Sequence, residues 1–195
     1  MFLKNVKYIL SAPSKEYYPK EKRKEICILG RSNVGKSTFI NKICNYNGLA
    51  KVSKTPGYTK YLNYFDVDGK YYLVDSPGYG YARLNRKLDK QFEKMMKSYI
   101  YENDNLKCCV MLVDAKVSFT DDDVLLLEML HDADVNVQII ASKEDKTNQS
   151  LRSKLKKDAK EILNDDEYEN MLLYSSLDDR TISKVVDRII EIYEN

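Results

Sequence analysis

The chain has 195 residues, 43% of them hydrophobic and 32% charged, and its formal net charge is +2. This composition predicts one folded domain with a sizeable core and excludes disordered and fibrous chains. No apolar stretch reaches the roughly 18 residues that a membrane-spanning helix needs. The N-terminus lacks a signal-peptide core and the four cysteines form no C-x-x-C pair, so we expect a protein of the reducing cytoplasm.

The chain begins with a basic stretch. Residues 1–24 hold seven Lys or Arg, two Glu and two prolines, and we expect an N-terminal basic extension there rather than a domain. A single domain is expected to follow over residues 25–195. Its first strand is the apolar run 26–29, which leads into a helix over residues 36–46.

Strands and helices alternate in the rest of the chain. Strands over 61–67 and 70–75 flank Asp68-Gly69, a dipeptide typical of tight hairpins, so we expect them to be antiparallel neighbours. Further helices are expected over 86–102, 121–134, 148–163 and 179–193, and further strands over 107–114, 135–142 and 171–175. This order predicts a three-layer α/β fold whose six-stranded sheet is mostly parallel with one antiparallel edge strand.

The run Gly30–Ser37 has the P-loop pattern G-x-x-x-x-G-K-S and comes directly after a predicted strand. A glycine-rich turn between a strand and a helix presents backbone N–H groups and the positive helix end to one point, where a polyphosphate binds. An accidental glycine turn is the alternative, and the strand–turn–helix context disfavours it. We expect Lys36 to contact the β- and γ-phosphates and the Ser37 hydroxyl to bind Mg²⁺.

A second motif, Asp75-Ser76-Pro77-Gly78, follows another apolar strand. An Asp at the carboxyl end of a strand beside a P-loop reaches Mg²⁺ directly or through water. The backbone N–H of Gly78 would meet the γ-phosphate. Thr59, between the two motifs, would supply a second Mg²⁺ oxygen once a γ-phosphate draws its loop down. The expected catalytic residues are Lys36, Thr59 and Gly78.

A third motif, Ser142-Lys143-Glu144-Asp145, ends the fifth strand of this domain. A carboxylate at Asp145 accepts two N–H bonds from the edge of guanine, which adenine cannot supply, and the stem of Lys143 would cover the base. A plain turn at the end of a strand is the alternative. The loop after the last strand, Tyr174-Ser175-Ser176, would close over the guanine.

These motifs resemble the EngB family, also called YihA or YsxC. The resemblance rests on Gly30–Ser37, on 54–59, on Leu62–Phe65 and above all on 75–82, read Asp-Ser-Pro-Gly-Tyr-Gly-Tyr-Ala. It covers essentially the whole chain and implies a Ras-like G domain, a P-loop GTPase that binds GTP or GDP with Mg²⁺ and is needed to assemble the large ribosomal subunit. It also implies that residues 57–61 form the first switch, with Thr59 on Mg²⁺.

This chain departs from the family pattern at three positions. Ser142 stands where Thr is usual, Ser76 where Leu is usual, and Tyr58 where a basic residue is usual. The first difference bears on guanine affinity and the others on the switches. The expected metal ligands are Ser37, Thr59 and Asp75. The expected nucleotide contacts are Gly30, Arg31, Ser32, Asn33, Val34, Gly35, Lys36, Ser37, Gly57, Tyr58, Thr59, Lys60, Tyr61, Asp75, Ser76, Pro77, Gly78, Ser142, Lys143, Glu144, Asp145, Tyr174, Ser175 and Ser176.

The sequence offers few groups to activate a water molecule. Tyr79 follows Gly78, where Ras-like GTPases place a water-orienting Gln, and the only histidine, His131, lies far from every motif. We expect intrinsic hydrolysis on the order of 10⁻³ s⁻¹ or slower, with stimulation by a partner. Asn33 either holds a K⁺ ion between the β- and γ-phosphates or only stabilises the loop through its side chain.

Two basic segments, 83–97 and 146–160, are either RNA-facing surfaces or ordinary solvated helix faces. Tyr79 and Tyr81 would be the tyrosines best placed to stack on unpaired RNA bases. We expect a monomer whose partner is the large ribosomal subunit precursor and its rRNA, with no DNA and no membrane partner.

Three functions of different classes fit these motifs. The leading one is a GTP-hydrolysing assembly factor for the large ribosomal subunit. The second is a guanine-nucleotide-gated binding module with negligible hydrolysis, and the third is a P-loop ATPase or kinase. A tRNA-modifying GTPase is disfavoured because the chain carries no additional catalytic domain.

Overall fold

The structure is a computed structural model that describes residues 2–51, 60–80 and 86–194. Its strands are β1 (Val6–Ala12), β2 (Glu25–Gly30), β3 (Leu62–Val67), β4 (Tyr71–Asp75), β5 (Leu106–Asp114), β6 (Asn136–Ser142) and β7 (Leu172–Leu173). Its α-helices are α1 (Lys36–Ile43), α2 (Arg86–Tyr101), α3 (Asp121–Asp132), α4 (Gln149–Ile162), α5 (Asp165–Glu169) and α6 (Asp179–Glu194). The described residues also form two short 3₁₀ helices, η1 (Lys15–Tyr17) and η3 (Glu144–Lys146), which lie in the connections.

The described strands form one sheet in the order β1-β3-β4-β2-β5-β6-β7. From β4 to β7 every neighbouring pair is parallel, so the carboxyl ends of these strands meet at one edge. The predicted hairpin is confirmed, because β3 runs antiparallel to β4 across the turn at Asp68-Gly69. In an open α/β sheet, ligands bind beyond this carboxyl edge.

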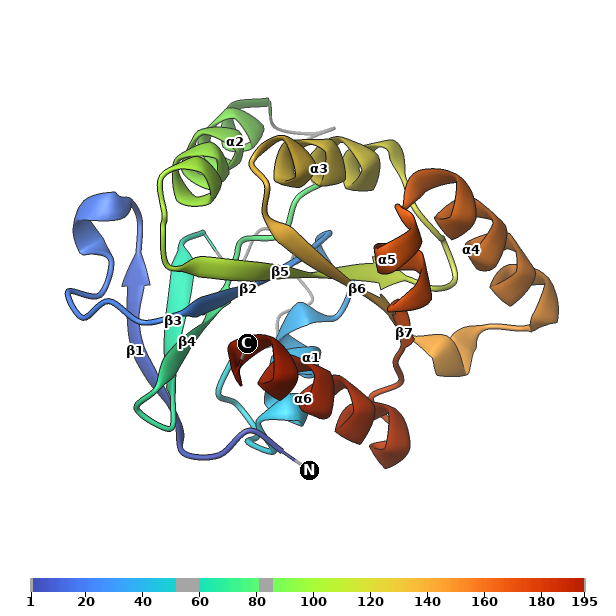
Figure 1. Ribbon diagram of the computed structural model, residues 1–195, viewed down its shortest axis with the longest axis horizontal. Helices are drawn as coiled ribbons and strands as arrows, with labels where there is room; N and C mark the ends of the chain where they lie inside the picture. Colours follow the sequence, from blue (N-terminus) through green and yellow to red (C-terminus); the bar gives the residue numbers. More distant parts are fainter. Residues whose placement is uncertain (1, 52–59, 81–85, 195) are drawn as a thin grey trace.

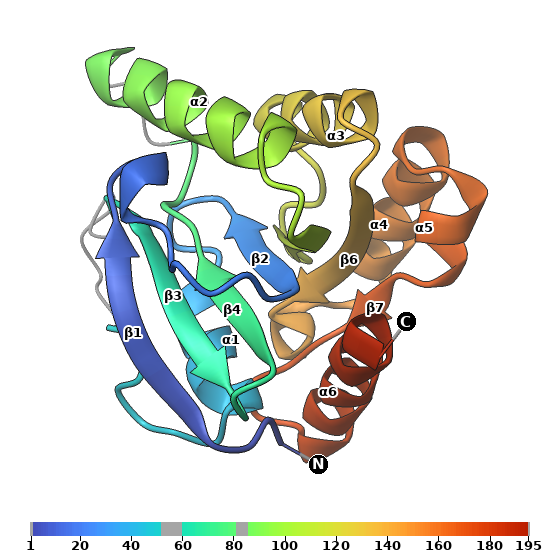
Figure 2. The same ribbon diagram turned by 60° about the vertical axis from the view of Figure 1, so that its left-hand side comes forward.

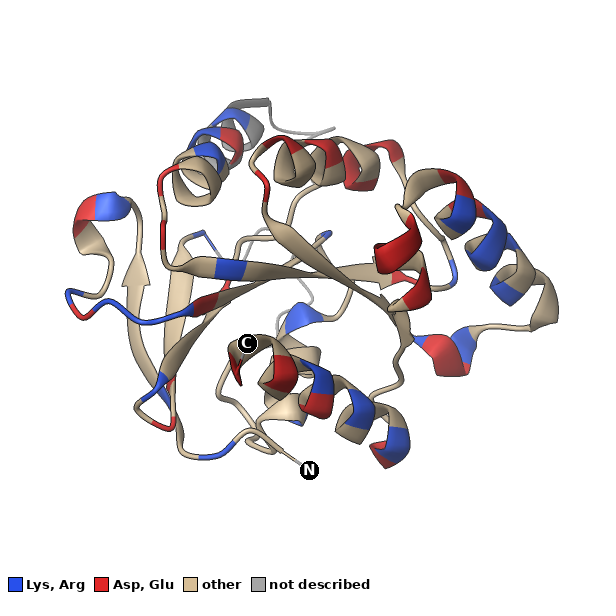
Figure 3. Cartoon of the chain, viewed as in Figure 1, with Lys and Arg blue, Asp and Glu red and all other residues tan. Residues whose placement is uncertain are grey.

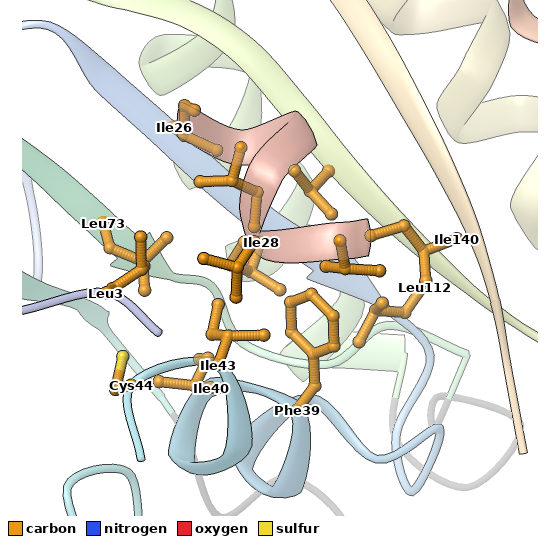
Figure 4. Packing of buried hydrophobic residues seen from close by; sticks show 14 of the residues in the cluster. Leu3, Ile26, Ile28, Phe39, Ile40, Ile43, Cys44, Leu73, Leu112 and Ile140 are labelled. Atoms are coloured by element: carbon orange, nitrogen blue, oxygen red, sulfur yellow. The ribbon is translucent and has the colours of Figure 1, made fainter. Parts of the chain in front are cut away.

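Helices cover both faces of the sheet, which confirms the predicted three-layer α/β architecture. Figure 1 shows α1 and α6 on one side and α2 and α3 on the other. The first layer packs Phe39, Ile40 and Ile43 of α1 against Ile26 and Ile28 of β2 (Figure 4). The other core joins the opposite sheet face to α2, α3 and the region of α4 and α5.

The N-terminal segment differs from expectation. The sheet has seven described strands, not six, because Val6–Ala12 pairs antiparallel with β3 and forms the outer edge (Figure 2). Leu3 is buried in the core, and its N–H donates to the Ile43 carbonyl at 2.9 Å. The sequence analysis missed this strand because it lies in a basic stretch and does not alternate regularly between apolar and polar residues. Apolar residues lie on both of its faces, and its register shifts between Tyr8 and Leu10.

Among the described residues, no helix combines the length and apolar character that crossing a bilayer requires.

Two helix boundaries are set by capping boxes. Thr120 caps α3 with Asp123, and Asn164 caps α5 with Glu167. The second box ends the expected helix 148–163 one residue early and starts a short helix, α5, that the sequence analysis did not include.

Candidate functional site

The P-loop joins β2 to α1 at the carboxyl edge of the sheet. All six residues of β2 are buried, and the chain leaves it at Gly30 and enters α1 at Lys36. Gly35, the residue before the helix, has a φ of 110°, a left-handed value that side chains other than glycine rarely adopt. The unpaired N–H groups of the first turn of α1 therefore point out of the loop, as anion binding requires.

Lys36 and Asp75 are both buried at the base of this loop, and each affects the pKa of the other. Burial lowers the pKa of Lys36, and Asp75 opposes that change. Burial raises the pKa of Asp75 to about 6, and Lys36 acts against it. The Oδ1 atom of Asp75 is buried and has no hydrogen-bond partner among the described residues. Phosphate oxygens would neutralise Lys36, and a cation would neutralise Asp75.

The residues present fit a magnesium ion with a nucleotide. Oxygen ligands suit Mg²⁺, which usually takes one or two protein carboxylates together with phosphate oxygens and water. Asp75 at the end of β4 and Ser37 in the first turn of α1 supply such oxygens. Bound there, Mg²⁺ would neutralise charge on the β- and γ-phosphates.

The second motif lies directly against the P-loop. The Ser32 N–H donates to the Tyr79 carbonyl at 2.9 Å, and Arg31 and Tyr79 form an isolated parallel bridge. A Cβ added to Gly78 would lie 2.9 Å from the Cα of Ser32. Only glycine fits this approach without moving backbone, so Gly78 is held beside the phosphate-binding turn.

The side chain of Tyr79 points to the first turn of α3. It is 6% exposed, and its hydroxyl donates to Asp123 at 2.7 Å. The same carboxylate lies 3.3 Å from Arg31 Nε and accepts from Thr120. Stacking of Tyr79 on RNA is thus a wrong expectation for this conformation, because the ring is buried. Tyr81 lies outside the described residues.

The third motif is tied to the P-loop by two side chains. The Ser142 hydroxyl lies 3.1 Å from the carbonyl of Val34, within donating distance. Lys143 Nζ donates to the carbonyl of Asn33 at 3.0 Å and pairs with Asp114 at 2.6 Å. These contacts fix the position of the third motif relative to the P-loop.

Asp145 is exposed and held in place by the loop after β7. Its Oδ1 atom accepts from the Ser175 hydroxyl at 2.8 Å, and the Glu144 N–H donates to the Tyr174 carbonyl at 3.1 Å. The side chain of Tyr174 is buried against Phe39, with ring centroids 5.1 Å apart, so it supports the loop from the core. The structure therefore brings together the residues that the sequence predicts to bind guanine.

Several expected residues play other parts or are not described. Gly57, Tyr58 and Thr59 lie outside the described residues, whereas Lys60 and Tyr61 are exposed just ahead of β3. Ser76, Pro77 and Gly35 are brought to the site, but the Ser76 hydroxyl donates to the Ile28 carbonyl and is buried. Asn33 and Ser176 lie at its surface, with Asn33 in a left-handed conformation at φ 65°.

Two acidic residues contribute to the site although the sequence analysis did not single them out. Asp114 holds Lys143, and Asp123 holds both Tyr79 and Arg31. Asp114 ends the apolar run of β5, and the end of a parallel strand beside a P-loop was a signal that could have found it. Asp123 was missed because it is one of three acidic residues in the first turn of α3, and such residues stabilise a helix N-terminus whether or not they have another role.

Comparison with known proteins identifies close relatives over nearly the whole chain. Residues 25–143 match the family described as "50S ribosome-binding GTPase". A "Probable GTP-binding protein EngB" of Streptococcus pneumoniae (strain Hungary19A-6) is 38% identical over 187 residues, which cover 96% of each chain. The protein of that name from Mesoplasma florum is 40% identical over 195 residues, covering 100% of this chain and 98% of the other.

Solved structures share the fold of this chain. A crystal structure of a probable GTP-binding protein engB has a TM-score of 0.72 and 21% identity, and covers 87% of this chain and 98% of that chain. Era in complex with MgGDPNP and nucleotides 1506–1542 of 16S ribosomal RNA has a TM-score of 0.62 and 18% identity, covering 85% and 56%. At these identities the structural likeness establishes the fold alone.

Proposed function

This chain belongs to the EngB family and is a GTPase, and from that premise we propose that it couples its nucleotide state to assembly of the large ribosomal subunit. The observation that carries the proposal is the connection from the P-loop to a basic helix. Gly78 and Tyr79 lie against Ser32 of the P-loop, and the chain then leads to α2. The exposed side of α2 carries Lys90, Lys94 and Lys97.

This α2 lysine face, formed by Lys90, Lys94 and Lys97, has the chemistry to bind RNA phosphates. Figure 3 shows basic residues gathered along α2. A hollow of about 590 Å³ lies along the helix and is lined by these lysines and by Glu93, Ser98, Tyr101 and Glu102. Clustered ammonium groups on a protein of small net charge are suited to a polyanion. A γ-phosphate that moves Gly78 would therefore alter how this face is presented.

We place GTP hydrolysis at the carboxyl edge of the sheet. Lys36 neutralises negative charge on the β- and γ-phosphates, and the first turn of α1 donates backbone N–H groups to them. The N–H of Gly78 would bind the γ-phosphate. Asp145, held by Ser175, selects guanine by accepting hydrogen bonds from its edge. Mg²⁺, held by Ser37, Asp75 and, by expectation, Thr59, would stabilise charge that develops in the transition state.

Slow intrinsic hydrolysis is part of this proposal. The Tyr79 hydroxyl is bound to Asp123, and His131 lies 2.6 Å from Glu167, between α3 and α5. Neither side chain orients a water molecule at the P-loop in this arrangement. We expect a rate on the order of 10⁻³ s⁻¹ or below without a partner. If Asn33 holds K⁺, replacement of K⁺ by Na⁺ lowers the rate, and an unchanged rate removes that ion from the mechanism.

The proposal is tested by co-sedimentation with large-subunit precursor particles, in GDP and in a non-hydrolysable GTP analogue. We expect the wild-type protein to bind more tightly in one nucleotide state. Lys90→Glu with Lys94→Glu should weaken binding by at least about tenfold through lost phosphate contacts. The matched control, Lys42→Glu with Lys184→Glu, makes the same change in net charge at exposed positions on α1 and α6. Equal binding in the two variants would contradict the proposal.

A guanine-nucleotide-gated binding module with incidental hydrolysis is the alternative that the same contacts permit. Single-turnover GTP hydrolysis separates the two. Stimulation by precursor particles supports a GTP-hydrolysing assembly factor, whereas nucleotide-dependent binding without stimulation supports the module. We place either activity in a cytoplasmic monomer.

A further inference from the structure

Helix α4 presents a second basic surface that the proposed function does not use. The helix packs on the protein through Leu155 and Ala159, which are buried. Lys156, Lys157 and Lys160 are all exposed. Since residues three or four apart lie on one side of a helix, these three side chains share the face that points away from the core. We call them the α4 lysine face.

The neighbouring charges leave this face positive. Lys157 Nζ lies 3.9 Å from Glu161, and this pair is exposed enough for water and salt to weaken it. The other basic residues of α4 point elsewhere, with Arg152 paired to Glu144 and Lys154 directed to the Val117 carbonyl. Within the described part of the chain, Lys156 and Lys160 form no ion pair.

The α4 and α2 lysine faces are separate surfaces. Both helices lie on the same side of the sheet, and α3, with its Asp and Glu residues, lies between them (Figure 3). One continuous basic groove across the three helices is therefore excluded, because an RNA strand crossing α3 would meet its carboxylates. A ligand of α4 must be held there independently of α2.

Helix α4 is also fixed differently from α2. It begins after the guanine-binding motif, where Asn148 caps it by accepting from the Leu151 N–H at 3.0 Å. Arg152 joins its first turns to Thr147 at 3.0 Å and to Glu144 at 2.5 Å. No segment of the second motif leads into it. The position of the α4 lysine face is thus set by the sheet and by the base-binding loop rather than by the γ-phosphate contact.

We propose that the α4 lysine face binds the phosphodiester backbone of ribosomal RNA in both nucleotide states, as a constant contact beside the gated contact on α2. This inference rests on the proposed ribosomal function and adds a second site to it. Compact ammonium groups suit phosphate contacts that position a protein without reading sequence. Helix α4 carries no aromatic side chain for stacking on bases. Its apolar residues face the protein core, which disfavours insertion into a lipid surface.

The test compares two triple variants of the full chain. Lys156→Glu, Lys157→Glu, Lys160→Glu reverses the α4 lysine face, and Lys42→Glu, Lys70→Glu, Lys184→Glu makes the same change in net charge elsewhere. All six lysines are exposed, and thermal unfolding verifies that each variant is folded. A second α4 variant with Gln at the three positions removes charge without adding any. Binding to precursor particles, and to naked rRNA extracted from them, is measured in GDP and in a GTP analogue.

We expect the α4 triple variant to bind naked rRNA at least about tenfold more weakly than the control triple variant. The factor should be the same in GDP and in the GTP analogue, and the slope of log affinity against log salt should fall by about two to three. The Gln variant should show a smaller loss in the same direction. On particles, the α4 variant should keep the ratio between the nucleotide states, whereas Lys90→Glu with Lys94→Glu should change that ratio.

The outcomes separate this inference from the proposed function. If the α4 and control variants bind rRNA equally, the inference is overturned while particle binding by the wild type still supports the function. If the wild type binds naked rRNA through α4 but never binds particles, the ribosomal function fails and the RNA contact stands. Binding of the wild type to neither overturns both. If the α4 triple variant loses binding to anionic lipid vesicles but binds rRNA as the control does, the RNA contact is also overturned.

Discussion

The hydroxyl of Tyr79 donates a 2.7 Å hydrogen bond to the Oδ1 atom of Asp123, and both side chains are buried. This bond fixes the residue that follows Gly78 to the first turn of α3. The backbone carbonyl of the same tyrosine accepts from the Ser32 N–H of the P-loop. One residue therefore connects the P-loop to α3 through its backbone carbonyl and its side-chain hydroxyl.

Tyr79→Phe tests this assignment. Removal of the hydroxyl leaves the buried Asp123 carboxylate without one donor, so the free energy of unfolding should fall by about 1.5–3 kcal/mol. Intrinsic single-turnover GTP hydrolysis should stay within about threefold of wild type, because the hydroxyl does not act as a general acid or base. Loss of such a group would slow hydrolysis by about a hundredfold or more. The measurements are chemical denaturation and phosphate release at saturating protein. A large loss of hydrolysis with unchanged stability would place the hydroxyl in the catalytic step instead.

Gly78→Ala tests the close approach of the second motif to the P-loop. The new Cβ would lie 2.9 Å from the Cα and Oγ of Ser32 and 3.0 Å from its backbone N. Backbone must shift to accept it, so the N–H that would meet the γ-phosphate is displaced. We expect GTP hydrolysis to fall at least about tenfold, in the range seen when an oriented backbone donor is lost.

Binding of GDP by Gly78→Ala should change by less than about threefold, since GDP lacks the γ-phosphate that this N–H would contact. Fluorescent GDP and GTP-analogue titrations measure the two affinities separately. Equal losses for both nucleotides would show that the substitution damages the whole P-loop.

Local patterns in the sequence were enough to predict the strand–turn–helix of the P-loop and the hairpin, and to select the residues that meet at the loop after β6. In each case the residues that define the feature are close together in the chain, as in Gly30–Ser37, and their backbone conformation follows from glycine and strand–helix order. The parallel sheet could be predicted as well, since continuous apolar runs such as Leu106–Asp114 require cover on both faces.

Contacts between distant segments could not be predicted in the same way. The Lys143–Asp114 pair and the bond from Tyr79 to Asp123 join residues that are 29 and 44 positions apart. Which acidic residue meets which partner depends on strand register and helix placement, and neither is encoded locally. The edge strand Val6–Ala12 was missed for a related reason, because its pairing with β3 decides its conformation more than its own composition does.

Ser142 provides a test of how the guanine loop is held to the P-loop. Its hydroxyl lies 3.1 Å from the carbonyls of both Val34 and Val113. Ser142→Ala removes this buried donor, and a buried hydrogen bond contributes about 0.5–1.5 kcal/mol. GDP should therefore dissociate about two- to tenfold faster.

Ser142→Thr is the matched control, because it keeps the hydroxyl and should keep the dissociation rate within about twofold of wild type. Stopped-flow release of fluorescent GDP provides the readout. Equal rates for the Ala variant and wild type would show that the hydroxyl does not set the loop position.

Glu25 anchors the last turns of α2 to the start of β2. It is buried, and its Oε2 atom accepts from the Tyr99 hydroxyl at 2.7 Å and from Asn103 at 2.9 Å. Burial raises the pKa of Glu25 above its ordinary value of 4.5, against the opposing effect of these hydrogen bonds. Between 4.5 and the raised pKa, the folded protein keeps a proton that the unfolded chain has lost.

Stability due to Glu25 is therefore greatest below pH 4.5 and declines as the pH rises through the raised pKa. Glu25→Gln keeps an oxygen that accepts from Tyr99 and cannot ionise, so the difference in unfolding free energy between this variant and wild type should shift in favour of Gln from pH 4.5 to pH 8. Glu25→Ala leaves two donors unpaired and should lower the free energy of unfolding by at least about 2 kcal/mol. Urea denaturation across that pH range measures both effects, and a difference between Gln and wild type that is independent of pH would show that Glu25 titrates normally.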